Sequence, residues 1–168
     1  MTLKLSDLVK DKTKVDIKDI CSGWTWLIST QKNVLLITIF GDIFFVGPSN
    51  EINWLDTGAS TLTKVADSVE EFQKLLKDKE NFANWFLTDL YTELQTKGVT
   101  LKDNEVYGYI KAPLIGGTYT LDNIEPTDIS VHFFILGQIG EQTKDLPDGT
   151  KVKITTDTPK QKPWWKKW

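Results

Sequence analysis

The stretch Val34–Val65 decides the fold: VLLITIFGDIFFVGPSNEINWLDTGASTLTKV. Short runs of β-branched and aromatic residues are separated here by turn residues, with tight connections at Gly41-Asp42 and Thr57–Ser60. Such side chains pack well on a pleated surface, and Gly, Asn and Asp permit the backbone angles of hairpin turns. The stretch therefore predicts an antiparallel meander of about four strands.

Two helices are predicted to follow the meander. Ser68 and Glu71 have the spacing of a capping box, in which each side chain accepts a hydrogen bond from a free backbone N–H at the helix start. This predicts a helix from Val69 to about Lys77. Apolar residues recur at helical spacing from Phe82 to Lys97, and Gly98 supplies a left-handed stop. Together the two segments predict a helical hairpin.

The segments outside this region give shorter signals. Leu3–Val9 predicts a short amphipathic helix, and Trp24–Ile28 predicts an aromatic entry into the core. Glu105–Ile110 alternates in the manner of a strand. Leu146–Gly149 is a strong turn, after which a last strand is expected at Lys151–Thr155.

The segment Asp128–Lys144 fits two structures. Its β-branched and aromatic residues favour a strand, whereas its Gln, Glu and Lys residues favour a helix. We expect a helix, because apolar residues recur at helical spacing and Thr127 or Asp128 can cap it. Gly137 and Gly140 count against a helix. The apolar positions at helical spacing are Ile129, Phe133, Leu136 and Ile139.

These elements predict an α+β fold. An antiparallel sheet, made of the meander and later strands, packs against a helical hairpin and a further C-terminal helix. The chain has 168 residues, of which 40% are hydrophobic and 11% aromatic, and this suits one domain. We assign residues 1–157 to that domain and residues 158–168 to a separate tail, because the tail is rich in Lys and Trp.

The composition argues against sequence-specific nucleic-acid binding and against a membrane span. The net charge is −3, and all 20 basic residues are Lys, which lacks the planar fork with which Arg grips phosphates and base edges. The longest apolar runs are far shorter than the roughly 20 residues that cross a bilayer. A single Cys, with no secretory leader at Met1–Lys18, indicates a cytoplasmic protein.

The chain contains few residues of the types that usually act in catalysis. We interpret its one His, His132, as a hydrogen-bonded, partly buried residue, and its one Cys, Cys21, as a core residue. Asp42, Asp56 and Asp128 each have a local role in a turn or a helix cap. We therefore predict no catalytic residue, no metal site and no cofactor. Binding is the leading class of function.

Seven separated motifs follow one another between Gly41 and Thr150. They are GDIFFV, NWLDTG, KVADSVEEF, NWFLTDLYTEL, YGYIKAPLIGGTY, NIEPTDISVHF and GQIGEQTKDLPDGT. In this order they resemble the C-terminal domain family of type VI secretion immunity proteins, over about Trp24–Ile154. The resemblance implies an α+β fold, a cytoplasmic location and neutralisation of a cognate effector by direct binding. In the family's best-known setting that effector is a toxic DNase.

Longer members of that family carry a glutamyl-amidotransferase-associated-like domain ahead of this one, and Met1–Asp19 is too short to be such a domain. An inhibitor of a nuclease must cover a basic groove, so it benefits from carboxylates that steer association and from aromatic anchors. Four residues on turns or at the ends of elements can present their side chains in this way. These hypothetical partner-binding residues are Trp54, Asp56, Glu125 and Asp128.

The leading hypothesis is a non-enzymatic immunity-type protein that occludes a secreted toxin, with its oligomeric state open. Two other functions are also considered. Scattered carboxylates together with His132 would suit a hydrolase. The tail Thr158–Trp168 interleaves Lys and Trp, which suits membrane headgroups, single-stranded nucleic acid or an acidic partner. In the simpler interpretation the tail lies along the domain, where Trp164 and Trp165 cover apolar surface.

Overall fold

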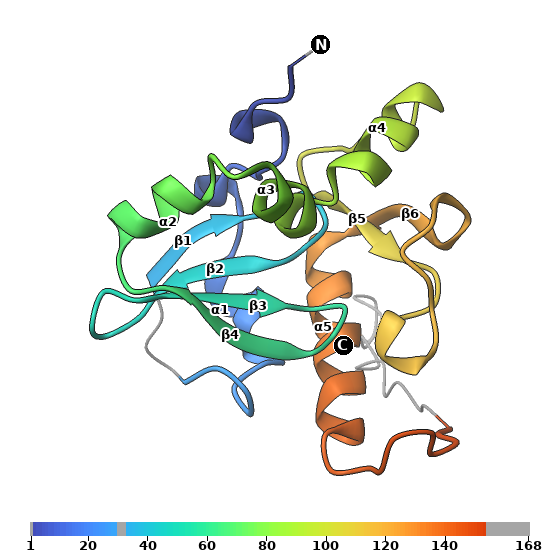
Figure 1. The fold of residues 1–168 in the computed structure, drawn as a ribbon. Helices are drawn as coiled ribbons and strands as arrows, with labels where there is room; N and C mark the ends of the chain where they lie inside the picture. Colours follow the sequence, from blue (N-terminus) through green and yellow to red (C-terminus); the bar gives the residue numbers. More distant parts are fainter. Residues whose placement is uncertain (1, 30–32, 154–168) are drawn as a thin grey trace, which may run out of the picture.

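The computed structural model describes residues 2–29 and 33–153, and it has the α+β arrangement expected from the sequence (Figure 1). Within these ranges a four-stranded sheet and a two-stranded sheet combine with five α-helices and several 3-10 turns. The expected tail, residues 158–168, lies outside the described residues. The division into one domain and a tail therefore stays a prediction.

The larger sheet is the meander that the sequence predicts. Its strands are β1 Asn33–Ile37, β2 Ile43–Val46, β3 Ile52–Asp56 and β4 Thr61–Ala66, in the order β1-β2-β3-β4. Every neighbouring pair is antiparallel. Gly41 takes a left-handed backbone (φ 81°) between β1 and β2, a conformation that glycine adopts without steric cost. The predicted tight connection at this position is confirmed.

Three helices follow β4, where the sequence predicts two. They are α2 Val69–Leu75, α3 Lys79–Phe86 and α4 Thr88–Thr96. The single helix expected from Phe82 to Lys97 is wrong, because Leu87 takes a left-handed backbone (φ 47°) that ends α3 and begins α4. The expected hairpin is therefore a run of three short helices.

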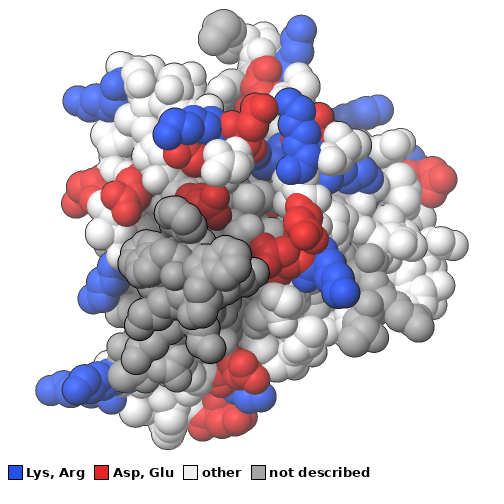
Figure 2. Space-filling view, turned by 180° about the vertical axis from the view of Figure 1, so that it is seen from behind, with Lys and Arg blue, Asp and Glu red and all other residues white. Residues whose placement is uncertain are grey.

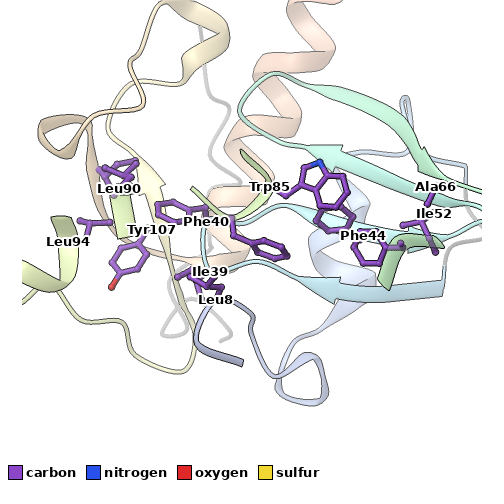
Figure 3. Packing of buried hydrophobic residues seen from close by; sticks show 13 residues of the cluster. Leu8, Ile39, Phe40, Phe44, Ile52, Ala66, Trp85, Leu90, Leu94 and Tyr107 are labelled. Atoms are coloured by element: carbon purple, nitrogen blue, oxygen red, sulfur yellow. The ribbon is translucent and has the colours of Figure 1, made fainter. Parts of the chain in front are cut away.

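The break at Leu87 allows α3 and α4 to pack against opposite ends of one hydrophobic core. Trp85 of α3 meets Phe44 of β2 edge-on, with ring centroids 5.6 Å apart. Leu90 and Leu94 of α4 lie at the other end of the same cluster, beside Tyr107 (Figure 3). A left-handed Leu costs about 1–2 kcal/mol, and burial of these large apolar side chains outweighs that cost.

Side-chain caps fix the starts of these helices. The hydroxyl of Ser68 accepts the backbone N–H of Glu71, as predicted. The Glu71 carboxylate accepts the N–H of Asp67, one residue before the position that a capping box requires. Asp78 caps α3 by accepting two backbone N–H groups, so this helix begins at Lys79.

The smaller sheet leads into the last helix. It pairs β5 Glu105–Tyr109, which is predicted, with β6 Ile124–Asp128 in antiparallel orientation. Sequence reasoning misses β6 because Pro126 cannot donate to a strand ladder and usually indicates a break. Next comes α5 Ile129–Thr143, so the ambiguous segment is the expected helix, and Asp128 caps it through its carboxylate.

The two glycines that count against a helix in α5 allow close packing. A Cβ atom at Gly137 would lie 2.6 Å from the carbonyl oxygen of Gly23, and one at Gly140 would lie 2.6 Å from Ser60 Oγ. Gly23 follows α1 Ile17–Ser22, a short helix that the sequence does not predict. The glycines are therefore needed where α5 approaches the residue after α1 and the connection between β3 and β4.

We expect Gly137→Ala to lower the free energy of unfolding by about 1–3 kcal/mol, because the added methyl group meets a backbone oxygen that cannot swing away. The roughly 1 kcal/mol that Ala gains over Gly in a helix offsets part of this loss. Urea unfolding measures the change. The control is Gln142→Ala at an exposed position of α5, for which we expect a change below about 0.5 kcal/mol. Equal stability of Gly137→Ala and the parent would contradict the close approach.

The larger sheet is the middle layer of the molecule. Successive residues of β2 face opposite sides of a strand: Phe44 joins the core beneath α2 and α3, and Phe45 joins the core on the side of α1 and α5 (Figure 1). The second core also contains Trp24 and Phe133, where the indole Nε1 of Trp24 donates to the carbonyl oxygen of Phe133 at 3.0 Å. The predicted entry of Trp24 into the core is confirmed.

Two expectations at the ends of the chain fail. Leu3–Val9 contains only a 3-10 turn at Leu5–Asp7, because Val9 extends to form a bridge with Thr38. Residues 151–153 are not a strand, and the remaining residues of the expected strand Lys151–Thr155 lie outside the described part of the chain.

Candidate functional site

A buried polar cluster joins the two tight connections of the meander to α5. Thr57, with 0% of its surface exposed, donates its backbone N–H to Asp42 Oδ1 at 2.9 Å. Its hydroxyl lies 3.0 Å from the same carboxylate oxygen and 3.0 Å from the carbonyl oxygen of Gly41. The hydroxyl also lies 3.2 Å from His132 Nε2. This network ties β1, β2 and β3 to α5.

Two tyrosines and a second carboxylate complete the cluster. A Cβ atom at Gly58 would lie 2.9 Å from the hydroxyl oxygen of Tyr119 and 3.2 Å from that of Tyr109. Glycine at this position therefore allows the two hydroxyl groups to approach the same turn. Asp56 holds the turn by accepting the backbone N–H of Ala59 at 2.9 Å.

Burial sets the protonation of these groups. Removal from water raises the pKa of the Asp42 carboxyl, and the nearby Asp56 raises it further. The pKa of Asp56 is itself raised by burial. Burial lowers the pKa of His132 to about 4, so its imidazole is neutral at pH 7. The cluster thus avoids buried charge mainly by holding Asp42 and His132 in their neutral forms.

The three groups at the centre of the cluster are buried, whereas Tyr119 at its edge is 45% exposed. Thr57 has 0%, Asp42 5% and His132 3% of their surface exposed. A hydrolase needs its nucleophile and base within reach of a substrate. Here Asp42, Thr57 and His132 make contacts with other groups inside the protein. His132 is the hydrogen-bonded residue that the sequence analysis expects, and it is more fully buried than expected. The hydrogen bonds among these three residues hold α5 against the connections of the meander.

The buried groups give two opposite dependences of stability on pH. The Asp42 carboxyl has a higher pKa in the folded protein than in the unfolded chain, where it is about 3.9. Above that value the folded protein holds the extra proton, so this group makes stability fall as pH rises through the folded pKa. His132 has the lower pKa in the folded protein, so between about pH 4 and 6.5 it makes stability rise with pH.

We expect Asp42→Asn to gain stability relative to the parent as pH rises from 4 to 8, because Asn keeps an acceptor oxygen and has no proton to lose. Urea unfolding of both proteins at several pH values measures the difference. Asp148→Asn makes the same chemical change at an exposed position and is the matched control. A constant difference for Asp42→Asn would show that this carboxyl does not titrate differently in the two states.

Two of the four predicted partner-binding residues lie half-buried beside this cluster. Trp54 stacks on Phe44, with ring centroids 6.0 Å apart and planes at 8°. Its buried indole N–H makes no hydrogen bond of normal geometry, although it lies near enough to Asp42 to lower the pKa of that carboxyl slightly. We interpret this as a long, weak contact. Trp54 and Asp56 therefore have evident packing and turn contacts, and their role in binding stays a prediction.

The other two predicted residues lie on β6. Asp128 Oδ1 accepts the N–H groups that begin α5, and its Oδ2 accepts the side-chain amide of Asn104 at 2.9 Å. Glu125 is exposed and lines a hollow beside α5. The structure thus divides the four predicted residues between two places, and Glu125 is the one at an open surface.

That hollow belongs to a longer apolar feature, which we call the α5 groove. The groove consists of two adjoining hollows of about 330 and 560 Å³ that share Lys111 and Ile115. It runs beside α5 from β5 to the segment that follows the helix. Its exposed apolar side chains are Ile110, Leu114, Val131, Ile135, Leu146 and Val152.

The α5 groove arises because α5 is apolar on more than its buried face. Val131 and Ile135 are one helical turn apart, and they are 46% and 36% exposed. The connection 110–117 after β5 lies alongside the helix (Figure 1) and adds Ile110, which is 60% exposed. Sequence reasoning misses this surface. The available signal is the Val131 and Ile135 pair, which lies off the stripe of apolar positions that predicts the helix.

Charge does not single out another surface. Glu125, Asp148, Lys111 and Lys151 line the α5 groove, so it has two carboxylates and two ammonium groups. Lys and acidic side chains are interspersed over the face seen in Figure 2. Contiguous exposed apolar surface is the better indication of an interaction site here, because scattered charges of both signs are normal for a protein surface.

Within residues 2–29 and 33–153, no group of three His, Cys, Asp or Glu side chains is placed to hold a metal ion. None of the helices described here is long and apolar enough to cross a bilayer. Cys21 is half-buried, and burial raises the pKa of its thiol to about 11, so it is a poor nucleophile at neutral pH.

Residues 66–140 match the family model described as T6SS immunity protein Tdi1, C-terminal. The match confirms the resemblance for this segment, which runs from the end of β4 to Gly140 in α5. It is shorter than the range Trp24–Ile154 expected from the motifs. It includes the part of the α5 groove between Ile110 and Ile139. No curated protein matches the chain.

Proposed function

We propose that this protein neutralises a cognate secreted toxin by binding it directly and covering the surface with which the toxin acts. The family match over residues 66–140 carries this proposal, because it supports a toxin-neutralising immunity protein. The proposed toxin is a nuclease, and the proposed place of the encounter is the cytoplasm. A binding role also agrees with the burial of Asp42, Thr57 and His132 at the centre of the polar cluster.

The α5 groove is the proposed docking surface. It lies largely within the matched segment, and it exposes apolar side chains that a partner would bury. Ile110, Val131 and Ile135 are suited to the centre of an interface, where excluded water makes apolar contacts strongest. Glu125 stands at the edge, where a carboxylate steers a basic partner such as a nuclease.

Protection of cells tests the proposed function. The toxin encoded by a neighbouring gene is expressed in a sensitive bacterium with and without the 168-residue chain. We expect the toxin alone to kill and the two proteins together to allow growth, with the pair recovered as one complex. Continued killing by a toxin that is soluble and co-expressed at equal level, with no complex recovered, would contradict the proposal.

A further inference from the structure

The α5 groove exposes more apolar surface than isolated side chains would explain. Among the described residues, seven large hydrophobic side chains are exposed, and six of them line this groove. The exception is Tyr119. Single exposed hydrophobic residues are ordinary, whereas a contiguous patch indicates a surface that something covers.

The chain leaves the described structure at this groove. Lys151 and Val152 line its larger hollow, and Lys153 is the last described residue. The 15 residues 154–168 therefore begin at the edge of the groove. Extended, they would reach about 50 Å, whereas α5, also 15 residues long, spans only about 22 Å. A tether this short keeps the segment near the groove at a millimolar effective concentration.

The segment 154–168 carries side chains that can cover the apolar surface of the groove. It carries Trp164, Trp165 and Trp168, and an indole combines a large apolar face with one polar N–H. Pro159 and Pro163 restrict its backbone, so docking costs less conformational entropy than for a flexible linker.

The segment 154–168 and the rest of the chain have opposite net charges. The segment 154–168 contains four Lys and one Asp and so has a net charge of +3. Because the whole chain has a net charge of −3, the remaining residues have a net charge of −6. Within the groove, Glu125 and Asp148 supply a carboxylate to each hollow, alongside Lys111 and Lys151. Opposite charges of this kind favour the contact and set its orientation more than they strengthen it.

We propose that residues 154–168 occupy the α5 groove in the free protein, with their indoles on Val131, Ile135 and Ile110 and their Lys side chains toward Glu125 and Asp148. The segment covers the apolar surface of its own chain. Bound within the same molecule, it competes with any other occupant of the groove.

Photo-crosslinking of the whole chain tests this placement. Trp165 is replaced by the photo-reactive aromatic residue benzoylphenylalanine, and the protein is irradiated at micromolar concentration without any partner. We expect crosslinks within one molecule, mapped by mass spectrometry to peptides that contain Ile110, Val131 or Ile135. Crosslinks mainly to other parts of the chain, or between two copies, would overturn the proposal. If no crosslinks form and the protein binds phosphatidylglycerol vesicles, the proposal is also overturned, and a membrane surface is then the occupant of the groove.

Matched variants make the test specific. Val131→Asp together with Ile135→Asp should reduce the crosslinks to the groove at least tenfold, because two charges replace the apolar contact. Gln142→Asp adds a charge at an exposed position of the same helix that does not line the groove, and it should leave the crosslinks unchanged. If the double variant loses its helical spectrum, Ile110→Asp, in the connection after β5, serves instead and should reduce the crosslinks at least threefold. Unchanged crosslinks in a folded groove variant would contradict the proposal.

One consequence rests on the proposed function as well. If the toxin docks in the α5 groove, residues 154–168 must leave first, and the apparent affinity for the toxin falls by the fraction of molecules in which the groove is open. Because the crosslinking uses no toxin, its failure would leave the proposed function untouched. Failure of the protection experiment would contradict the proposed function and would leave the placement of residues 154–168 in the groove untouched.

Discussion

Replacing Val131 and Ile135 together with Asp should weaken binding of the toxin about 100-fold or more. Neither side chain belongs to either buried core cluster of the described structure, so the change leaves the core intact. In the complex, the proposed contact would bury two carboxylates without partners among apolar groups, and this is strongly unfavourable. A 100-fold change corresponds to about 2.7 kcal/mol, which is the size of effect seen when central residues of an interface are replaced.

Biolayer interferometry with immobilised toxin measures this effect, and protection of cells gives a second readout. Gln142→Asp carries the matched control charge on α5 and should bind within about twofold of the parent, since Gln142 does not line the groove. Thermal unfolding of each variant shows that the fold is retained. If the folded double variant binds as tightly as the parent, the toxin docks elsewhere on the molecule.

Phe44→Ala should have the largest effect on stability, a loss of about 3–5 kcal/mol in the free energy of unfolding. Phe44 has 0% of its surface exposed and belongs to the core cluster that α2 and α3 cover, where it lies next to Trp85 (Figure 3). Its ring centroid lies between 5.0 and 6.1 Å from those of four other aromatic rings. These rings belong to Trp54, Phe72, Trp85 and Phe86. Such a loss is a large part of the 5–15 kcal/mol typical of a domain.

Phe82→Ala makes the same chemical change where the ring is half-buried and, among the described aromatic pairs, meets only Phe86, in a tilted arrangement with centroids 5.0 Å apart. We expect it to cost less than half as much as Phe44→Ala. Urea denaturation of both variants, followed by tryptophan fluorescence and far-UV circular dichroism, measures the difference. A loss below about 1 kcal/mol for Phe44→Ala would show that this ring is not central to the core.

Local signals in the sequence predict the meander and the last helix. Turn residues such as Gly41-Asp42 separate the strand runs, and Asp128 supplies the cap of α5, so these elements depend on residues close together in the chain. The strand β6 is hidden because Pro126 usually indicates a break. The end of α3 at Leu87 depends on where α3 and α4 meet the sheet, and no residue nearby in sequence indicates it.

The candidate site is harder to predict from the sequence than the fold. Glu125 is expected at a surface and is exposed there, but Trp54 and Asp56 pack beside the buried cluster. The α5 groove requires the connection 110–117 to lie alongside α5, which is a contact between parts of the chain far apart in sequence. Which apolar residues stay exposed, such as Val131, is decided only when these parts assemble.

The most direct measurement is the activity of the purified toxin in the presence of increasing amounts of the 168-residue chain. If the protein neutralises the toxin by occluding it, activity falls in proportion to the amount added and disappears at one equivalent, at concentrations above the dissociation constant. Full toxin activity at several equivalents, under conditions where light scattering shows the complex to be formed, would contradict neutralisation by occlusion.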